Sequence, residues 1–198
     1  MKWIGLSGGL ASGKSTVANF LRRKGFSVLD ADQIAKDVLQ NGTLGLQKVV
    51  ETFGKDLIGS DGELNRQKMA QVVFNSPSDL QKLEAIVHPL VKAKVKETRK
   101  KLEEKGTKIA FYDVPLLFEK NLQSQFDATV LVSCSETLQR SRMKSRNRWS
   151  DEEIEARLKA QLPLAKKKKL AKFIIHNNSD LDQLETQVEL LLKSLQKN

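Results

Sequence analysis

Residues 8–15 of this chain read Gly-Gly-Leu-Ala-Ser-Gly-Lys-Ser, which matches the pattern G-x-x-x-x-G-K-[ST] of a phosphate-binding loop. Such a loop wraps closely around a polyanion and points successive backbone N–H groups inward, so glycines are needed where side chains would block the approach. An apolar run precedes the loop and a helical pattern follows it, as the motif requires. The segment therefore predicts a triphosphate-binding enzyme with an α/β fold.

Each residue of the loop has an expected task. Lys14 can reach the β- and γ-phosphates, and the Ser15 hydroxyl can complete the coordination of Mg²⁺. Thr16 continues into a helix whose positive N-terminus faces the same phosphates. The alternative is a glycine-rich turn that binds nothing. The predicted ATP contacts of the loop are Gly8, Gly9, Leu10, Ala11, Ser12, Gly13, Lys14, Ser15 and Thr16.

The length and composition narrow the class of protein. A chain of 198 residues indicates one core domain with small appendages. No apolar run is long enough to span a bilayer, and glycines interrupt the amino-terminal segment where a signal peptide would need an apolar stretch. We therefore expect a cytoplasmic protein without a membrane partner. The single cysteine, Cys134, excludes an internal disulfide and a cysteine metal cluster, and its apolar surroundings favour a packed thiol.

The positive charge is concentrated in one stretch of the chain. Residues 140–172 hold twelve Lys or Arg against four Asp or Glu, which places +8 of the net charge of +10 there. Such a segment suits either a nucleic-acid backbone or a small polyanion such as ATP in a cleft. Only Trp149 and Phe173 accompany it as aromatic residues, which disfavours a binder of single-stranded nucleic acid.

Carboxylates follow two of the predicted strands. A strand over residues 26–29 ends at Asp30-Ala31-Asp32, and a strand over residues 108–114 contains Asp113 near its end. Ligands of open parallel sheets bind beyond the carboxyl ends of the strands. Asp32 is a candidate for catalysis or, alternatively, the cap of a helix over residues 33–40. Asp113 fits either an acid that holds Mg²⁺ through water or a solvated strand end.

The middle of the chain, from Gly45 to Arg99, shows helical patterns that predict an all-helical insertion. Residues 56–59 match the D-x-x-G of GTPase switches, but the chain has no N-K-x-D motif to read guanine, so a turn is expected there. His88-Pro89 is expected to break a helix, because the residue before a proline is pushed out of the helical region. On that interpretation His88 is a helix-end residue.

After a predicted strand over residues 128–133, a helix carries several arginines. Arg142 and Arg146 are four residues apart and share a face, which suits either a solvated surface or a lid that closes on a transferred phosphate. Ser150-Asp151-Glu152-Glu153 predicts a capping box at the start of the next helix. The four lysines at 166–169 are interpreted as a solvated stretch. A strand over residues 173–176 and an amphipathic helix over residues 180–197 complete the chain.

These motifs in this order give the chain a family resemblance. The phosphate loop, Asp30-Ala31-Asp32, His88-Pro89, the segment Pro-Leu-Leu-Phe-Glu at 115–119 and the arginine-rich lid resemble the dephospho-CoA kinase family along essentially the whole sequence. The resemblance implies a three-layer P-loop core with a parallel sheet, a helical substrate domain and a helical lid. Their approximate bounds are residues 1–32, 106–138 and 170–198 for the core, 33–105 for the substrate domain and 139–169 for the lid.

The resemblance also implies an activity and the residues that carry it. The reaction is transfer of the ATP γ-phosphate to the ribose 3′-hydroxyl of dephospho-CoA, with Mg²⁺, which forms coenzyme A in the last step of its biosynthesis. The implied catalytic residues are Asp32, which accepts the hydroxyl proton, and Lys14, Arg142 and Arg146. Arg142 and Asn177 join the loop in binding ATP. The acceptor contacts are Asp32, His88, Pro89, Leu116, Leu117, Phe118 and Glu119, and the metal contacts are Ser15 with Asp30 and Asp113 through water.

The chain departs from the family pattern at Asn147, Lys172 and His176, and these changes raise the local positive charge. Two other functions stay open at this point. One is a related kinase that acts on another small alcohol, and the other is an ATP-dependent nucleic-acid-binding protein supported by the basic segment.

Overall fold

The computed structural model of the protein describes residues 1–197, with the backbone only at Asn147, whose side chain lies outside the described part. By its contacts the chain divides into two compact units. The first, called the sheet unit, comprises Met1–Leu29 and Gly106–Asn198, and the second, called the helical unit, comprises Asp30–Lys105. The contacts thus group the predicted lid residues with the sheet.

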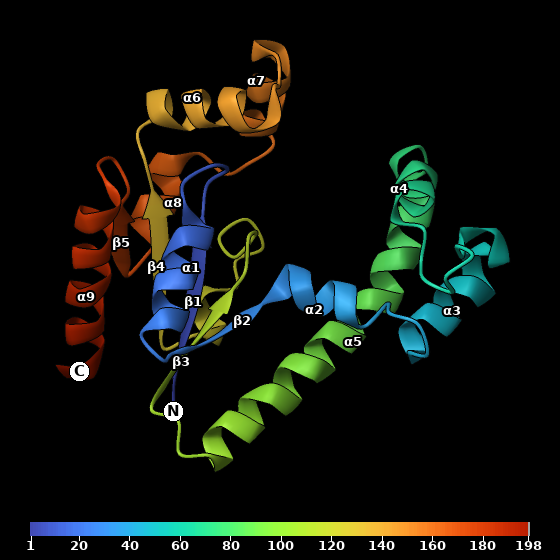
Figure 1. The fold of residues 1–198 in the computed structure, drawn as a ribbon, viewed down its shortest axis with the longest axis horizontal. Coiled ribbons are helices and arrows are strands. Elements are labelled where there is room, and N and C mark those ends of the chain that lie inside the picture. Colours follow the sequence, from blue (N-terminus) through green and yellow to red (C-terminus); the bar gives the residue numbers. More distant parts are fainter. Residues whose placement is uncertain (198) are drawn as a thin grey trace. The chain divides into compact units, whose positions relative to one another are not determined.

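The sheet has five strands in the order β2-β3-β1-β4-β5, which confirms the predicted α/β class (Figure 1). Its strands are β1 (Lys2–Gly8), β2 (Ser27–Asp30), β3 (Ile109–Asp113), β4 (Ala128–Ser133) and β5 (Phe173–His176). The helices of the unit are α1 (Lys14–Arg23), α6 (Glu136–Asn147), α7 (Asp151–Lys159), α8 (Leu164–Leu170) and α9 (Leu181–Lys197), with a short 3₁₀ turn η2 (Gln123–Gln125).

Strand β1 is central and pairs in parallel with β3 and β4. Six of its seven residues are buried, as expected for a parallel strand covered on both faces. The register places Leu6 beside Asp113 and Gly8 beside Val132. The carboxyl ends of the three strands therefore meet at one edge of the sheet, where the phosphate loop leaves β1.

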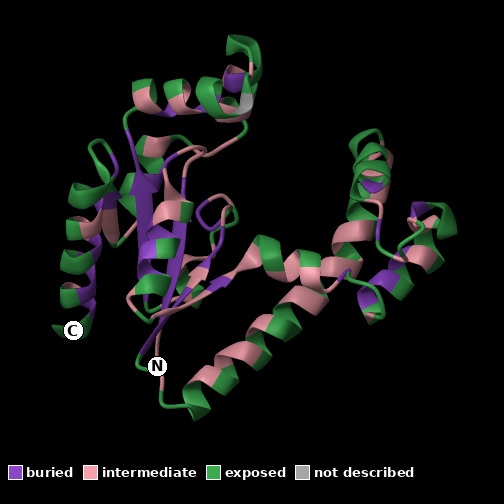
Figure 2. Cartoon of the chain, in the orientation of Figure 1, coloured by how far each residue is buried: buried purple, intermediate pink, exposed green. Residues whose placement is uncertain are grey.

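Helices α1 and α9 pack against this sheet in one apolar cluster (Figure 2). Gly25, at φ +83°, follows the end of α1 in the left-handed conformation that glycine tolerates best. The predicted inward face of α9 is confirmed, since Leu184, Val188, Leu191 and Leu195 are all buried. The capping box at Ser150 and Glu153 is also confirmed at the start of α7.

The helical unit consists of α2 (Ala31–Asp37), α3 (Leu44–Phe53), α4 (Arg66–Phe74) and α5 (Pro77–Glu104), with a 3₁₀ turn η1 (Lys55–Leu57). It has its own apolar cluster, formed by Leu39, Leu46, Val49, Leu57, Leu64 and Met69. The predicted turn at residues 56–59 overlaps with η1. An isolated antiparallel bridge between Ile58 and Leu64 follows η1. The helical character predicted for this region is confirmed.

The predicted helix break at His88-Pro89 is wrong. Helix α5 runs without interruption from Pro77 to Glu104, with Pro89 in its interior and both residues exposed. Proline removes one backbone donor and disfavours a helical residue before it, but these local costs are small beside the packing of a whole helix. Leu83, Ile86 and Val87 pack against the apolar cluster of the unit, and α2, α3 and α4 all contact α5. Tertiary packing therefore carries the helix through the proline.

No helix within residues 1–197 combines the length and the apolar character that a membrane crossing requires.

Candidate active site

The phosphate loop is held in shape by its own backbone and by one asparagine. Gly13 lies at φ +89°, and a side chain there would overlap with the amide of Asn177. That amide, which is buried, donates from Nδ2 to the carbonyl oxygen of Ser12 at 2.8 Å. Gly8 is equally restricted, because a Cβ there would lie 3.0 Å from the carbonyl oxygen of Val132. The pattern glycines thus stand where neighbouring atoms leave no room for a side chain.

Ala11 adds backbone strain to the loop. It adopts φ +51°, a left-handed conformation that residues with a Cβ rarely take. Such strain persists only where surrounding contacts fix the backbone, and it is common where a loop is shaped for a ligand. The nearby contact of Gln139, whose Nε2 donates to the carbonyl oxygen of Leu10 at 2.6 Å, is one that restrains this segment.

Lys14 and Asp113 form an ion pair at the carboxyl edge of the sheet. Lys14 is the first residue of α1, and its Nζ donates to Oδ1 of Asp113 at the end of β3. Asp113 is only 3% exposed. The alternative of a solvated strand end is therefore wrong, and the reason is the register, which sets Asp113 beside Leu6 of the central strand. A carboxylate so deeply buried requires a charged partner.

Asp30, and not Asp32, caps α2. Strand β2 continues through Asp30, whose extended backbone (φ −119°, ψ 117°) lets its Oδ1 accept from the backbone N–H of Gln33 at 3.0 Å. The helix therefore begins at Ala31, two residues earlier than predicted, and the capping alternative for Asp32 is wrong. Asp32 lies exposed in the first turn of α2. The Asp32 carboxylate therefore does not serve as the cap of α2.

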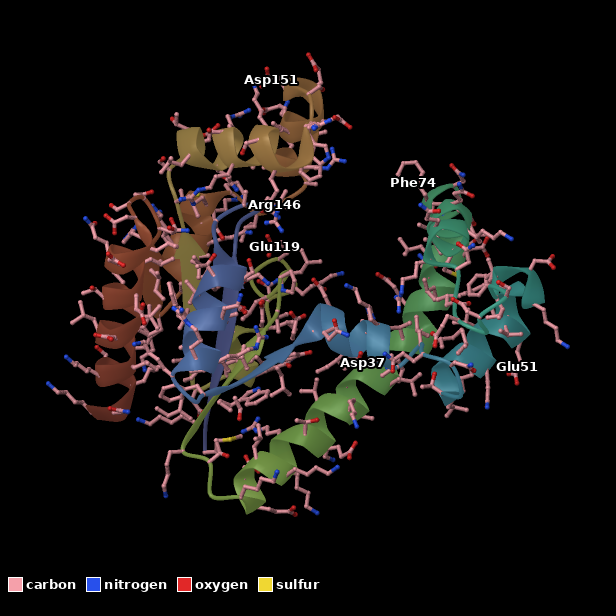
Figure 3. The ribbon with its side chains drawn as sticks, viewed as in Figure 1. Asp37, Glu51, Phe74, Glu119, Arg146 and Asp151 are labelled. Atoms are coloured by element: carbon pink, nitrogen blue, oxygen red, sulfur yellow. The ribbon has the colours of Figure 1, made fainter. Side chains whose placement is uncertain are left out.

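Helix α6 places two arginines beside the phosphate loop. Both Arg142 and Arg146 line a cavity of about 490 Å³ that also contacts Gly13, Ser15 and Asn177. Arg146, which Figure 3 labels, is exposed. Arg142 is partly buried, and its Nη1 is a buried donor without a hydrogen-bond acceptor among the described residues. A partly buried guanidinium with one buried N–H group that lacks an acceptor, next to a phosphate loop, suits contact with an anionic ligand.

Cys134 follows β4 and packs against the loop, as predicted for a buried thiol. It is 4% exposed, and its Sγ lies 4.0 Å from the carbonyl oxygen of Ala11. Burial raises the pKa of this thiol, and the nearby Arg142 opposes that shift. The raised pKa keeps Cys134 protonated near neutral pH, so it acts as a packing residue.

The Leu116–Glu119 segment divides sharply by exposure. Leu117 and Phe118 are at most 1% exposed, whereas Leu116 is 45% exposed. Leu116 is thus the side chain of this segment that is most open to an acceptor. Glu119, which Figure 3 labels, follows β3 in the chain. Its Oε1 accepts from the backbone N–H of Leu162 at 3.2 Å and pairs with Lys167.

The interpretation of residues 166–169 as a solvated stretch is wrong for one of the four. Lys166, Lys168 and Lys169 are exposed, but Lys167 is 1% exposed and its Nζ lies 2.5 Å from Oε1 of Glu119. A helix spreads consecutive residues around its axis, and α8 turns one of the four lysines inward. Other charges of the basic segment are also paired with carboxylates, namely those of Arg140, Lys144, Arg157 and Lys159.

Gln139 contacts the phosphate loop although no pattern in the sequence indicates this role. Its side chain is 8% exposed and contacts the phosphate loop from α6. A single glutamine in a helix of polar and charged residues has the pattern of a surface residue. His88 and Pro89 lie on α5 in the helical unit, where both are exposed.

A five-stranded sheet with a phosphate loop after its central strand, and basic helices beyond β4, defines a kinase-like P-loop nucleotide-binding protein. A shikimate kinase from Bacteroides thetaiotaomicron shares this fold, with a TM-score of 0.52 at 13% identity. The family model for dephospho-CoA kinase matches residues 2–183, and the chain belongs to that family.

Individual relatives match along nearly the full length. A dephospho-CoA kinase of Bdellovibrio bacteriovorus is 45% identical over 197 residues, which cover 100% of this chain and 98% of the relative. One from Streptococcus mutans is 41% identical, with 98% of each protein covered. Among solved structures, the dephospho-CoA kinase of Campylobacter jejuni superimposes with a TM-score of 0.76 at 26% identity, covering 98% of this chain and 97% of its own. A protein of Thermus thermophilus reaches a TM-score of 0.81 at 34% identity, with the same coverage.

Proposed function

We propose that this chain transfers the γ-phosphate of ATP to the ribose 3′-hydroxyl of dephospho-CoA and so forms coenzyme A. The observation that carries the proposal is the family match over residues 2–183. The restrained phosphate loop and the two arginines beside it agree with a phosphoryl donor at the edge of the sheet. In phosphoryl transfer the protein mainly positions the reactants and neutralises charge, and this site offers both.

On the donor side, the backbone N–H groups of the loop and the N-terminus of α1 would hold the phosphates of ATP. Lys14 would neutralise charge on the β- and γ-phosphates. Arg142 and Arg146 would approach the same phosphates from α6, and Asn177 would keep the loop in the shape that binds ATP. These groups contribute most where negative charge develops during transfer.

The oxygen donors near the loop suit Mg²⁺. This ion prefers hard oxygen ligands and is commonly held by one or two carboxylates together with substrate phosphates. Ser15 at the start of α1 and the buried carboxylate of Asp113 provide such oxygens, and Asp30 is a further candidate through water, although its Oδ1 caps α2. When bound, Mg²⁺ would neutralise part of the phosphate charge.

On the acceptor side, Asp32 would accept the proton of the ribose hydroxyl. Its carboxylate is exposed in the first turn of α2, and the cap of that helix is already supplied by Asp30. Leu116, His88 and Pro89 are the exposed candidates for contacts with the acceptor. Leu117 and Phe118 would support the acceptor segment from the core.

The substrates proposed here are the partners of the chain, and a cytoplasmic location belongs to the same proposal. Nucleic-acid binding is less favoured because five of the twelve basic side chains in the segment form ion pairs with carboxylates, namely those of Arg140, Lys144, Arg157, Lys159 and Lys167.

The test is Mg²⁺-dependent release of ADP with dephospho-CoA, compared with AMP, adenosine and shikimate at equal concentration. We expect turnover with dephospho-CoA alone, and chromatography should show coenzyme A as the product. Turnover with a different acceptor would keep the kinase and reject the proposed substrate. With no turnover on any acceptor, salt-dependent retention on RNA or DNA would decide for the nucleic-acid function.

A further inference from the structure

Lys167 occupies an unusual position for its residue type. It is 1% exposed, whereas lysines are almost never fully buried without a partner. The charge is balanced by Glu119, whose Oε1 lies 2.5 Å from Nζ and whose side chain is 13% exposed. Such a pair is expensive to bury and is weak evidence for stability alone, so its presence beside the site calls for another reason.

The ion pair connects the segment after β3 with the α7–α8 region, which lines a cavity together with Gly9 of the phosphate loop. Glu119 belongs to the segment after β3, and it also accepts from the backbone N–H of Leu162 in the connection between α7 and α8. Lys167 donates further to Oε1 of Gln161 in that same connection, at 3.5 Å. One carboxylate and one ammonium thus fix the turn after β3 to the base of the predicted lid.

Gln161 extends this cluster to the loop. Its Oε1 lies 3.9 Å from the point that a Cβ would occupy on Gly9. Gly9, Gln161 and Lys167 line a common cavity of about 440 Å³, separate from the cavity that contains Arg142 and Arg146. Lys167 donates to the carbonyl oxygen of Gln161, and because the amide is planar, fixing that oxygen also fixes the direction of its two N–H donors.

We propose that Lys167 is a positioning residue for phosphoryl transfer: it orients the amide of Gln161 beside Gly9 so that the N–H donors meet the phosphate transferred from ATP. Donors fixed in advance stabilise developing charge without reorganisation during the reaction. Glu119 balances the charge of Lys167 and sets its direction. The proposal rests on the kinase function proposed above.

The test compares kcat and the KM for ATP across a small set of variants. Lys167→Met removes the ammonium, and Gln161→Leu removes the donors without removing a buried charge. Lys168→Met is the matched control, with the same change of charge at an exposed neighbour on the same helix. We expect kcat to fall roughly 10- to 100-fold for Lys167→Met and Gln161→Leu, with the KM for ATP within about twofold of wild type. Lys168→Met should match wild type.

Lys167→Met leaves Glu119 buried without its partner and therefore lowers Tm. The double variant Lys167→Met with Glu119→Gln removes both charges, and we expect its Tm to recover while kcat stays low. Recovery of kcat together with Tm would show that the pair is only structural. Unchanged kcat in Gln161→Leu would also overturn the proposal, and this variant decides the question if both Lys167 variants fail to fold.

The two proposals fail in different ways. Wild-type protein that turns over no dephospho-CoA contradicts the proposed acceptor, and the variants are then compared with the acceptor that wild type does use. Wild-type turnover together with a normal kcat in Lys167→Met contradicts only the role of Lys167.

Discussion

The candidate residues of the sheet unit and those of the helical unit are held in opposite ways. In the sheet unit, buried contacts fix several of them: Asn177 donates to Ser12, and Lys14 pairs with Asp113. In the helical unit, Asp32 and His88 are exposed. The comparison indicates that folding itself organises the proposed ATP contacts, whereas buried contacts do not hold the exposed side chains proposed to meet the acceptor. Substitutions should therefore affect stability and catalysis together in the sheet unit, and catalysis alone at Asp32.

The largest effect is expected for Lys14→Ala. The variant loses the cation beside the phosphates, and kcat/KM should fall about a thousandfold, near 4 kcal/mol of transition-state stabilisation. Tm should fall as well, because the substitution removes the ion pair between Lys14 and the buried carboxylate of Asp113. Steady-state formation of coenzyme A and a thermal melt measure the two quantities.

The control is Lys108→Ala, which removes an exposed lysine of the same unit. A loss of less than tenfold in Lys14→Ala would contradict the role assigned to this lysine.

Asp32→Asn should lower kcat about a hundredfold through loss of the proton acceptor. The KM for ATP and the Tm should stay unchanged, because Asp32 is exposed and does not cap α2. Full turnover in this variant would remove Asp32 as the base. Asp37→Asn, at the other end of α2, serves as the matched control and should behave as wild type.

Asn177→Ala should lower the free energy of unfolding by about 1–3 kcal/mol, because the carbonyl oxygen of Ser12 loses a buried donor. The KM for ATP should rise, since the loop is no longer held in its bound shape. Urea unfolding measures the free energy of unfolding, and initial rates at varied ATP concentration measure the KM.

The neighbouring Asn178→Ala provides the comparison, because Asn178 is exposed and its Oδ1 accepts from the backbone N–H of Ser135 at 2.7 Å, outside the loop. Equal effects of the two substitutions would mean that the buried contact of Asn177 has no special role.

The smallest effect is expected for Asp30→Ala, which removes the cap of α2 and should cost about 1 kcal/mol of unfolding free energy. Asp30→Asn should keep that stability, because asparagine caps as well as aspartate does. If Asp30→Asn raises the Mg²⁺ concentration needed for half-maximal rate, Asp30 also serves the metal. A stable Asp30→Ala variant would instead argue that α2 needs no cap.

Much of the sheet unit follows from local sequence. The strand over residues 173–176 and the one over 128–133 have the predicted bounds, because apolar runs of four and six residues are short for a helix and their length favours a strand. The phosphate loop was equally predictable, because the backbone conformation and close packing of the loop require glycine at the pattern positions.

The incorrect predictions concern features that depend on contacts between residues far apart in the sequence. The burial of Lys167 depends on Glu119, which lies far away in the sequence and carries no pattern that pairs the two. The start of α2 depended on how far β2 continues, and the pairing of β2 within the sheet settles that. The side chains of Gln139 and Gln161 reach the loop by tertiary placement alone.

Pro89 has a consequence for the behaviour of α5 in solvent. This helix of 28 residues contains a proline that has no amide hydrogen to offer to the carbonyl oxygen one turn earlier, at Ala85. One backbone hydrogen bond is therefore missing near the middle of α5. The part before Pro89 packs in the helical unit, and the part after it is long, charged and ends at Glu104. In a hydrogen–deuterium exchange experiment, the two halves should open as separate segments, with the boundary at this proline.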